Sequence, residues 1–382
     1  MPDFELDPHA HQPGNGSGSN HVAAALGGAH SPAGNPGTAP HRATNFGSGS
    51  HSASPSPNGP TSWPILRPGA PVSTGPMTVF PIEGIPDHSP DYILLADAIK
   101  HELARVQEVD KGGQVPLLML DSRADLPILA IQGEELIGAK QNRTLNVSIL
   151  AGRGKTEIPV TCIERGRWAY NSRNFGAGGF EHYMLRRKKA AMVSSSRKLR
   201  RPAHRRVESY AADQGAVWQE VDHQLASHQV ASPTASLSDL YSNDRVSSML
   251  DRFDVGMKLP ATTRGVVVAF GDQVVSAEIF ECPKVFAKLW PRILRSYAVT
   301  AMNQMAVRET QGEGPGKDQA GKNGGPTLEQ AEAFLLGPCN VEGKSEESVG
   351  LGQDVRWETD GFLACSLFHE GRMLHGTVYG RA

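Results

Sequence analysis

The stretch Val266–Phe280, VVVAFGDQVVSAEIF, decides the fold class that this sequence predicts. Two apolar runs rich in valine flank Gly271-Asp272, a composition typical of two antiparallel strands joined by a tight turn. The end of the chain repeats the pattern, because the apolar runs Phe362–Phe368 and Met373–Tyr379 are separated by a few turn residues. Strands that follow one another in such pairs predict a mainly antiparallel sheet.

Helical patterns occur singly between the strand pairs. Apolar residues recur at helical spacing over Leu94–Ile99, Gln214–Leu225 and Phe286–Tyr297. Thr327 is expected to cap a further helix that ends near Leu336. Because strands and helices do not alternate regularly, the sequence predicts a single α+β domain with a mainly antiparallel β-sheet and several packed helices.

This domain is expected to span residues 76–382, after a tail over residues 1–75. The tail is rich in Gly, Ser, Pro and His and has almost no large apolar side chains, so it cannot bury enough surface to offset its ordering entropy. It is therefore expected to be disordered. Within the domain, a basic insert is expected near residues 186–206 and a mobile, Gly-rich loop near residues 311–326.

The bulk composition excludes several classes of protein. The chain of 382 residues is 39% hydrophobic and has a net charge of -2, so it can bury a large core and is not built mainly to coat nucleic acid. It shows neither a secretory signal pattern nor an apolar run that could cross a bilayer, and a cytoplasmic protein without a membrane partner is expected. Four scattered cysteines favour free thiols. No metal site, P-loop, zinc protease or standard serine hydrolase motif is found, and the sequence does not identify a cofactor.

The densest group of polar residues is Gly133–Arg143, GEELIGAKQNR, which lies between two apolar runs. A second polar group, Glu164–Trp168, follows the alternating run Ile158–Ile163. If Leu145–Leu150 is one strand, side-chain alternation places Arg143 on the same face as its apolar residues, and Glu164 extends the equivalent face of the next strand. We therefore expect Arg143 and Glu164 to pair at the rim of the core. The alternative is two separately hydrated charges or a purely structural ion pair.

Glu134 and Glu135 are neighbours in the sequence, so in an extended strand they point to opposite faces and are not expected to face inward together. Either carboxylate would instead meet Glu164 or His375 across the fold, or pair with Lys140. Glu135 and Glu164 are the candidate catalytic groups, each as a general base.

The remaining polar residues suit an anionic, partly aromatic ligand. Lysine and arginine offer donors for phosphate or carboxylate, and neutral amides suit a sugar or a base edge. Trp168 would stack on an aromatic ring, although a tryptophan is more often part of the core. The predicted ligand-binding residues are Glu134, Lys140, Gln141, Asn142, Arg143, Arg167, Trp168 and His375.

These residues resemble the family named for its association with ADP-ribosylglycohydrolases and rhodanese-phosphatases, abbreviated ARPP. The resemblance covers the chain after Met77. It rests on the segments GEELIGAKQNRTLN (Gly133–Asn146), IPVTCIERGRW (Ile158–Trp168), QGAVWQEV (Gln214–Val221), AEIFECPKVFAKLWPRILRSYA (Ala277–Ala298) and LHGTVYG (Leu374–Gly380). What the resemblance implies is binding or processing of an ADP-ribose-like or other NAD-derived nucleotide.

Two alternatives stay open. The first is a hydrolase or transferase that acts on such a metabolite with a glutamate as general base. The second is a non-enzymatic interaction protein that recruits partners through the basic insert and the tail. A nucleic acid partner is the less favoured form of this second alternative, because no groove-reading motif accompanies the basic residues.

Overall fold

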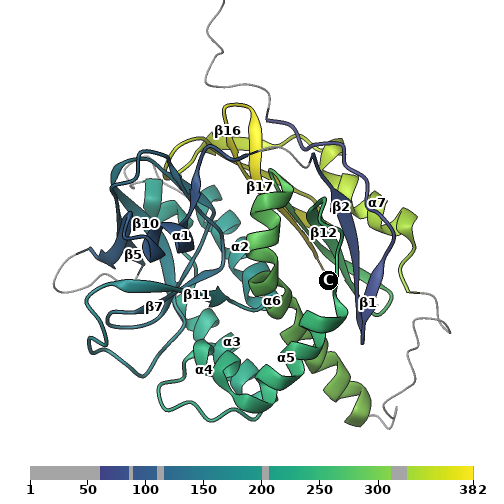
Figure 1. Cartoon of the computed structure of the whole chain (residues 1–382), viewed down its shortest axis with the longest axis horizontal. Helices are drawn as coiled ribbons and strands as arrows, with labels where there is room; N and C mark the ends of the chain where they lie inside the picture. The colour runs from purple at the N-terminus through teal and green to yellow at the C-terminus, as the bar shows by residue number, and fades with distance from the viewer. Residues whose placement is uncertain (1–60, 86–88, 110–115, 200–205, 311–324, 382) are drawn as a thin grey trace, which may run out of the picture. The chain divides into compact units, whose positions relative to one another are not determined.

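The computed structural model describes residues 61–85, 89–109, 116–199, 206–310 and 325–381, all within one compact unit (Figure 1). The predicted tail up to residue 60, residues 200–205 of the basic insert and residues 311–324 of the predicted loop lie outside the described residues. The described part is an α+β fold with extensive antiparallel sheet, as predicted. None of its helices is both long and apolar enough to span a membrane.

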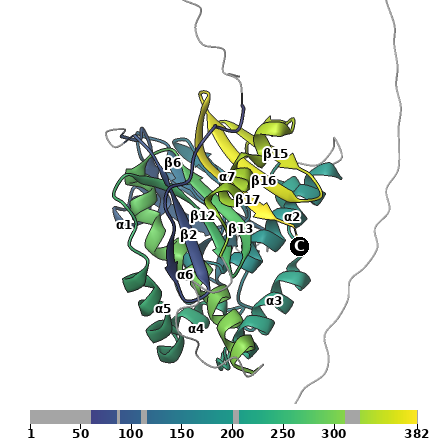
Figure 2. The same ribbon diagram turned by 90° about the vertical axis from the view of Figure 1, so that its right-hand side faces the viewer.

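The largest sheet has eight strands in the order β1-β2-β12-β13-β17-β16-β15-β14, and Figure 2 shows its central strands side by side. Both predicted hairpins are confirmed, because β12 pairs with β13 and β16 pairs with β17, each antiparallel. The strands are β1 (Val72–Thr74), β2 (Met77–Glu83), β12 (Thr263–Phe270), β13 (Gln273–Phe280), β14 (Lys344–Glu347), β15 (Gln353–Glu358), β16 (Phe362–His369) and β17 (Arg372–Gly380).

Helices cover both faces of this sheet. The long helix α6 (Pro283–Thr310) shares one core cluster with alternate residues of β12, including Val266 and Val268. The short helix α7 (Leu328–Leu336) lies on the other face, and Thr327 caps it as predicted. Trp63 is buried on the same face and donates a hydrogen bond to the Leu335 carbonyl at 2.9 Å. Packed chain therefore begins before residue 76, the predicted start of the domain.

The second large element is a closed six-stranded barrel, in the order β10-β5-β4-β11-β7-β8. Alternate side chains of its strands fill the interior, among them Val106, Leu120, Leu136, Leu145 and Val160. The barrel strands are β4 (Ala104–Glu108), β5 (Leu117–Ser122), β7 (Glu134–Gly138), β8 (Arg143–Leu145), β10 (Gly154–Cys162) and β11 (Phe175–Phe180).

The expected single strand over Leu145–Leu150 is wrong, because the chain leaves the barrel after β8. It then forms β9 (Ile149–Ala151) in a separate three-stranded sheet with β3 (Ile93–Leu94) and β6 (Ile128–Ala130). Helix α1 (Leu95–Lys100) follows β3 and packs on the barrel, in agreement with the helical spacing of Leu94–Ile99. The polar turn between β6 and β7 is thereby held between two sheets.

Helix α2 (Tyr183–Lys198) connects the barrel to the eight-stranded sheet and contains the first part of the expected basic insert. Its side chains Arg186, Lys189 and Arg197 are all buried, and each has a carboxylate partner. A run of like charges does not show which residues face inward on a helix, so the burial of these side chains could not be predicted from the sequence. The remaining helices are α3 (Gln214–Ser227), α4 (Leu237–Ser242) and α5 (Asp244–Gly256), with short 3-10 turns at Arg206–Tyr210 and Gly337–Asn340.

Candidate functional site

The polar stretch Gly133–Arg143 forms the β7–β8 hairpin of the barrel, and Glu164–Trp168 leaves the end of β10 beside it. Gly133 has a φ of +85°, and a Cβ placed there would lie 2.6 Å from the Cδ atom of Arg186. Both conditions require glycine at the entrance to β7. The structure thus brings the two predicted polar groups together.

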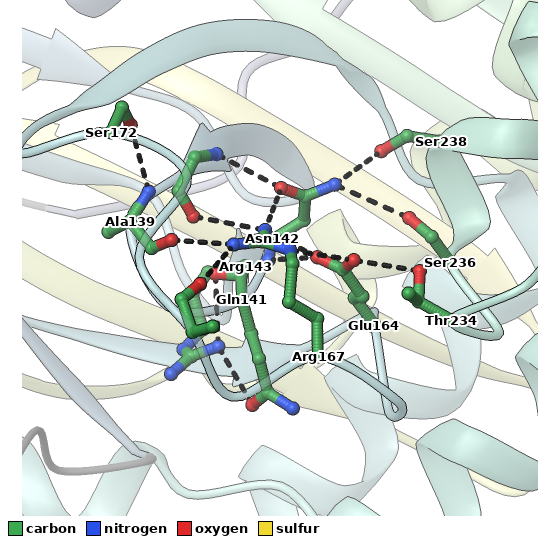
Figure 3. A network of polar contacts seen from close by, with 12 residues as sticks. Ala139, Gln141, Asn142, Arg143, Glu164, Arg167, Ser172, Thr234, Ser236 and Ser238 are labelled. Carbon is green, nitrogen blue, oxygen red and sulfur yellow. Dashed lines mark hydrogen bonds and ion pairs between the residues drawn. The ribbon is translucent and has the colours of Figure 1, made fainter. Parts of the chain in front are cut away.

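Arg167 joins these groups (Figure 3). Its Nε and Nη2 atoms donate to the two oxygens of Glu164 at 2.9 and 2.6 Å, and its Nη1 atom donates to the Ala139 carbonyl at 2.6 Å. The Asn142 backbone N–H donates to the same Glu164 carboxylate at 3.0 Å. We call Glu164, Arg167 and Asn142 the lock, because they fasten the β7–β8 turn to the segment after β10.

The lock also reaches the start of α4 and the segment before it. The Asn142 amide donates to the hydroxyls of Ser236 and Ser238, and the Thr234 hydroxyl donates to Glu164 at 2.8 Å. Burial alone would raise the pKa of Glu164, but the hydrogen bonds from Arg167, Asn142 and Thr234 outweigh it and hold that pKa below its ordinary value. Glu164 is therefore an ionised structural anchor.

The predicted Arg143–Glu164 pair is wrong. Arg143 is fully buried, its Nη2 atom lies 3.8 Å from the Glu108 carboxylate, and its Nη1 atom donates to the Gln141 carbonyl at 3.0 Å. Side-chain alternation correctly places Arg143 on the inward face of β8, but closure of the barrel brings β4 and its Glu108 to that face. Gln141 is also buried, and its amide donates to the Arg165 carbonyl at 3.2 Å.

The part of this region that faces solvent is aromatic. Trp168 is 50% exposed and Tyr170 is 56% exposed, so the alternative of a core tryptophan is wrong. The Lys140 Nζ atom lies 5.2 Å from the Trp168 ring centroid and 5.3 Å from the Tyr170 ring centroid, within cation–π range of both. We call these three residues the aromatic clamp. Tyr170 is not among the residues predicted from the sequence, although it lies two positions after Trp168, a spacing that places side chains on one side of an extended chain.

Glu134 and Glu135 are both buried, contrary to the expectation that only one would face inward. Both faces of β7 are covered by other parts of the protein. The two carboxylates point to opposite faces, as alternation predicts, but both faces are buried. Glu134 accepts a hydrogen bond from Arg292 of α6 at 3.1 Å and does not pair with Lys140. Burial, together with the charge of the nearby Glu181 carboxylate, raises the pKa of Glu135 to about 8.

Glu135→Gln is expected to change how stability depends on pH. Because the folded-state pKa of Glu135 is raised from 4.5 to about 8, the folded protein holds this proton more tightly than the unfolded chain does. Wild-type protein therefore loses stability as pH rises across that window, and the variant does not. The melting temperature of the variant should exceed that of wild type by a few degrees at pH 8 and by less at pH 5.

Glu164→Gln is the control for this titration, because the pKa of Glu164 is lowered. Its carboxylate contributes stability above pH 4.5 that is lost as pH falls, so the deficit of this variant should be largest at neutral pH and shrink in acid. Parallel melting curves for Glu135→Gln and wild type between pH 5 and pH 8 would contradict the shift assigned to Glu135.

His375, the last predicted ligand-binding residue, lies on β17 and takes no part in the lock. Its Nε2 atom is 3.2 Å from the Glu278 carboxylate, and its Nδ1 atom is 2.8 Å from the Ser148 hydroxyl. Glu278 in turn pairs with Arg186. This buried polar row between barrel and sheet is distinct from the clamp. No group of three or more His, Cys, Asp or Glu side chains in the described ranges is arranged to hold a metal ion.

Comparison with known proteins adds one finding. The model of a family described as the ARG and Rhodanese-Phosphatase-superfamily-associated Protein domain matches residues 65–379. No curated protein and no solved structure matches the chain. The matched range includes the lock, the clamp and the polar row around His375.

Proposed function

The chain belongs to this family, and from that premise we propose that it binds an ADP-ribose-like or other NAD-derived nucleotide at the aromatic clamp. The description of the family links it with the ADP-ribosylglycohydrolase and rhodanese-phosphatase superfamilies. Ligands of that class combine an aromatic base with negatively charged phosphates. The proposal therefore needs a surface that offers both an aromatic face and a positive charge.

The observation that carries the proposal is the exposure of two rings beside one cation. Trp168 and Tyr170 each keep about half of their surface open to solvent. The Lys140 ammonium lies next to both rings, and only 8% of this residue is exposed. A base stacked on such a ring gains about 1–3 kcal/mol, and a lysine close by favours phosphate oxygens. Exposed aromatic rings of this size are otherwise costly to leave in water.

The lock supports the clamp without contacting the ligand. Arg167 directs its donors to Glu164, Asn142 and main-chain carbonyls, including that of Ala169, between the two aromatic residues. Trp168 and Tyr170 therefore project from a segment whose backbone is fixed. A rigid loop lowers the entropy that binding must overcome. Arg167, Asn142 and Glu164 are thus assigned to positioning, whereas the sequence analysis expected direct contact with the ligand or catalysis.

A general-base role of Glu164 and a nucleic acid site on the basic insert both lose support in this geometry. Glu164 is a poor general base, because its pKa is lowered and both of its oxygens accept hydrogen bonds within the protein. Recruitment of nucleic acid by the basic insert is also disfavoured, because Arg186, Lys189 and Arg197 are buried in ion pairs.

Trp168→Ala is expected to weaken nucleotide binding by about 5- to 150-fold, the equivalent of 1–3 kcal/mol of lost stacking. The measurement is the thermal shift of wild type and variant with ADP-ribose, NAD and ADP, since saturation at about 100 times Kd stabilises a protein by about 2.7 kcal/mol. Val255→Ala, which trims another exposed apolar side chain, is the control and should bind as wild type does. Wild-type protein that shows no shift with any nucleotide of the panel at millimolar concentration would refute the proposal.

A further inference from the structure

We propose that Ser148 is the nucleophile of a second site, in which His375 and Glu278 activate its hydroxyl for transfer of a small acyl group from an ester or thioester to water. This site shares no residue with the aromatic clamp, so it can be tested independently of nucleotide binding there. The three residues come from three separate segments: the loop between β8 and β9, strand β17 and strand β13.

The geometry is that of a serine–histidine–carboxylate relay. The Ser148 Oγ atom lies 2.8 Å from His375 Nδ1, and His375 Nε2 lies 3.2 Å from a Glu278 oxygen. The ring of Phe280 packs against the imidazole with 4.8 Å between ring centroids, which limits its rotation. Such relays are identified by these relative positions and not by the order of the residues in the chain.

The charge on Glu278 fixes the proton on the histidine. Arg186 donates to both oxygens of Glu278 at 2.8 and 2.7 Å, and the Tyr297 hydroxyl donates to it at 3.0 Å. Burial alone would raise the pKa of Glu278, but the charge of Arg186 and the bond from His375 lower that pKa to about 2. An ionised Glu278 holds the proton on His375 Nε2. The Nδ1 lone pair then faces the Ser148 hydroxyl and can accept its proton.

Ser148 lies at a small cavity that has unused polar groups in its wall. The cavity has a volume of about 10 Å³, room for about one water, and is lined by Gln132, Ser148, Ser366 and His375 among others. Within the described residues, the buried Gln132 Nε2 and Ser366 Oγ atoms have no hydrogen-bond partner. Buried polar atoms are nearly always paired, so these two indicate a ligand that would satisfy them.

The same wall offers donors for the reaction. The Gln132 backbone N–H donates to Ser148 Oγ at 3.0 Å, which favours the oxygen as it loses its proton. The unpaired Gln132 amide supplies a further donor for the carbonyl oxygen of a substrate, where negative charge develops. Ser148 is only half-buried, so a substrate can approach it from outside. A cavity of this size excludes acyl groups larger than acetyl.

The reaction has two balanced steps. In the first, the Ser148 proton moves to His375 Nδ1, the Oγ–carbonyl carbon bond forms, and the bond from that carbon to the alcohol or thiol breaks. The leaving group takes the proton from His375. In the second, a water gives a proton to His375 and attacks the acyl carbon, and the bond to Ser148 breaks as the proton returns to Oγ. The products are an alcohol or thiol and a carboxylic acid.

The test uses the full chain with p-nitrophenyl acetate, with release of p-nitrophenolate and peptide-resolved mass spectrometry as the two readouts. We expect an acetyl group on Ser148, and we expect Ser148→Ala and His375→Gln each to slow acylation by at least about 100-fold. Ser345→Ala on β14 is the matched control and should react as wild type does. Acylation that is found only on other residues, or that persists unchanged in Ser148→Ala, would overturn the proposal.

A second variant tests the proposal even if His375→Gln does not fold. Ser148→Cys keeps a nucleophile at the same place, and its acetylation should fall by a similar factor when Glu278→Gln is added, with a cooperative melting transition confirming that both proteins are folded. Equal rates in the single and double variants would contradict activation through His375. Nucleotide thermal shifts measured on Ser148→Ala separate the two proposals, because the clamp should bind normally in that variant.

Discussion

Arg186→Met is expected to lower the free energy of unfolding by about 3–5 kcal/mol, the usual cost of removing one partner from a buried ion pair. Arg186 and Glu278 are both fully buried, and two hydrogen bonds of 2.8 and 2.7 Å join them. Methionine fills much of the volume of arginine but leaves the Glu278 charge in the interior without its cation. Urea denaturation of wild type and variant at neutral pH gives the measurement.

Two further proteins make this result interpretable. Arg187→Met, one position along α2, removes a partly exposed side chain that donates to the Gly380 carbonyl, and should cost less than about 1.5 kcal/mol. The double variant Arg186→Met/Glu278→Gln removes both charges and should recover part of the stability, because the two single effects are coupled. If Arg186→Met lowered the free energy of unfolding by less than about 1 kcal/mol, Glu278 would not need this arginine as its partner, and the prediction would be wrong.

Arg167→Leu is expected to cost about 2–3 kcal/mol of stability and to abolish nucleotide binding, although we assign Arg167 no contact with the ligand. The substitution leaves the Glu164 carboxylate, which is buried, without its main partner. It also frees the segment that carries Trp168 and Tyr170, so the two rings lose their fixed positions beside Lys140. The measurements are urea denaturation and the thermal shift with ADP-ribose.

Arg165→Leu is the matched control for this prediction. Arg165 lies two positions away and pairs with Asp222 at 2.8 Å, but nearly half of each side chain is exposed. Exposed pairs contribute about 0–1 kcal/mol, so this variant should stay nearly as stable as wild type and keep its ligand. If Arg167→Leu bound nucleotide with wild-type affinity, the lock would have no role in presenting the clamp.

The parts of the fold that could be predicted are those whose signals are local. The hairpin Val266–Phe280 contains its own turn. The capping box of α7 involves only Thr327 and Gln330, three positions later. A periodic apolar pattern also identified α6, although that helix begins at Pro283 and continues to Thr310. In each case the residues that determine the structure are neighbours in the sequence.

Closure of the barrel could not be predicted, and the error in the partner of Arg143 follows from it. Glu108 comes from β4, which reaches β8 only after the whole barrel has closed. The burial of both Glu134 and Glu135 has a similar cause. Alternation along β7 predicts opposite faces, but it does not show that the second face is also covered.

The relay of Ser148, His375 and Glu278 shows the same limit at a site. The sequence identified His375 as a polar residue within an apolar hairpin. It gave no reason to connect that residue with a serine in a distant loop, because the motif that usually surrounds a catalytic serine is missing. The register of β13 against β17, with Phe280 opposite His375, brings Glu278 near that histidine, and the loop between β8 and β9 brings Ser148 to its other side.

The strand order of the eight-stranded sheet has a consequence for how the protein is made. Strand β2 pairs with β12, and β13 pairs with β17, so the centre of the sheet contains both early and final segments of the chain. Pairings between such distant segments make folding slow, and larger chains pass through intermediates with open strand edges. During translation, the edge of β13 that pairs with β17 therefore stays uncovered until Arg372–Gly380 has left the ribosome. A chain that ends before Arg372 loses the middle of this sheet and not its margin.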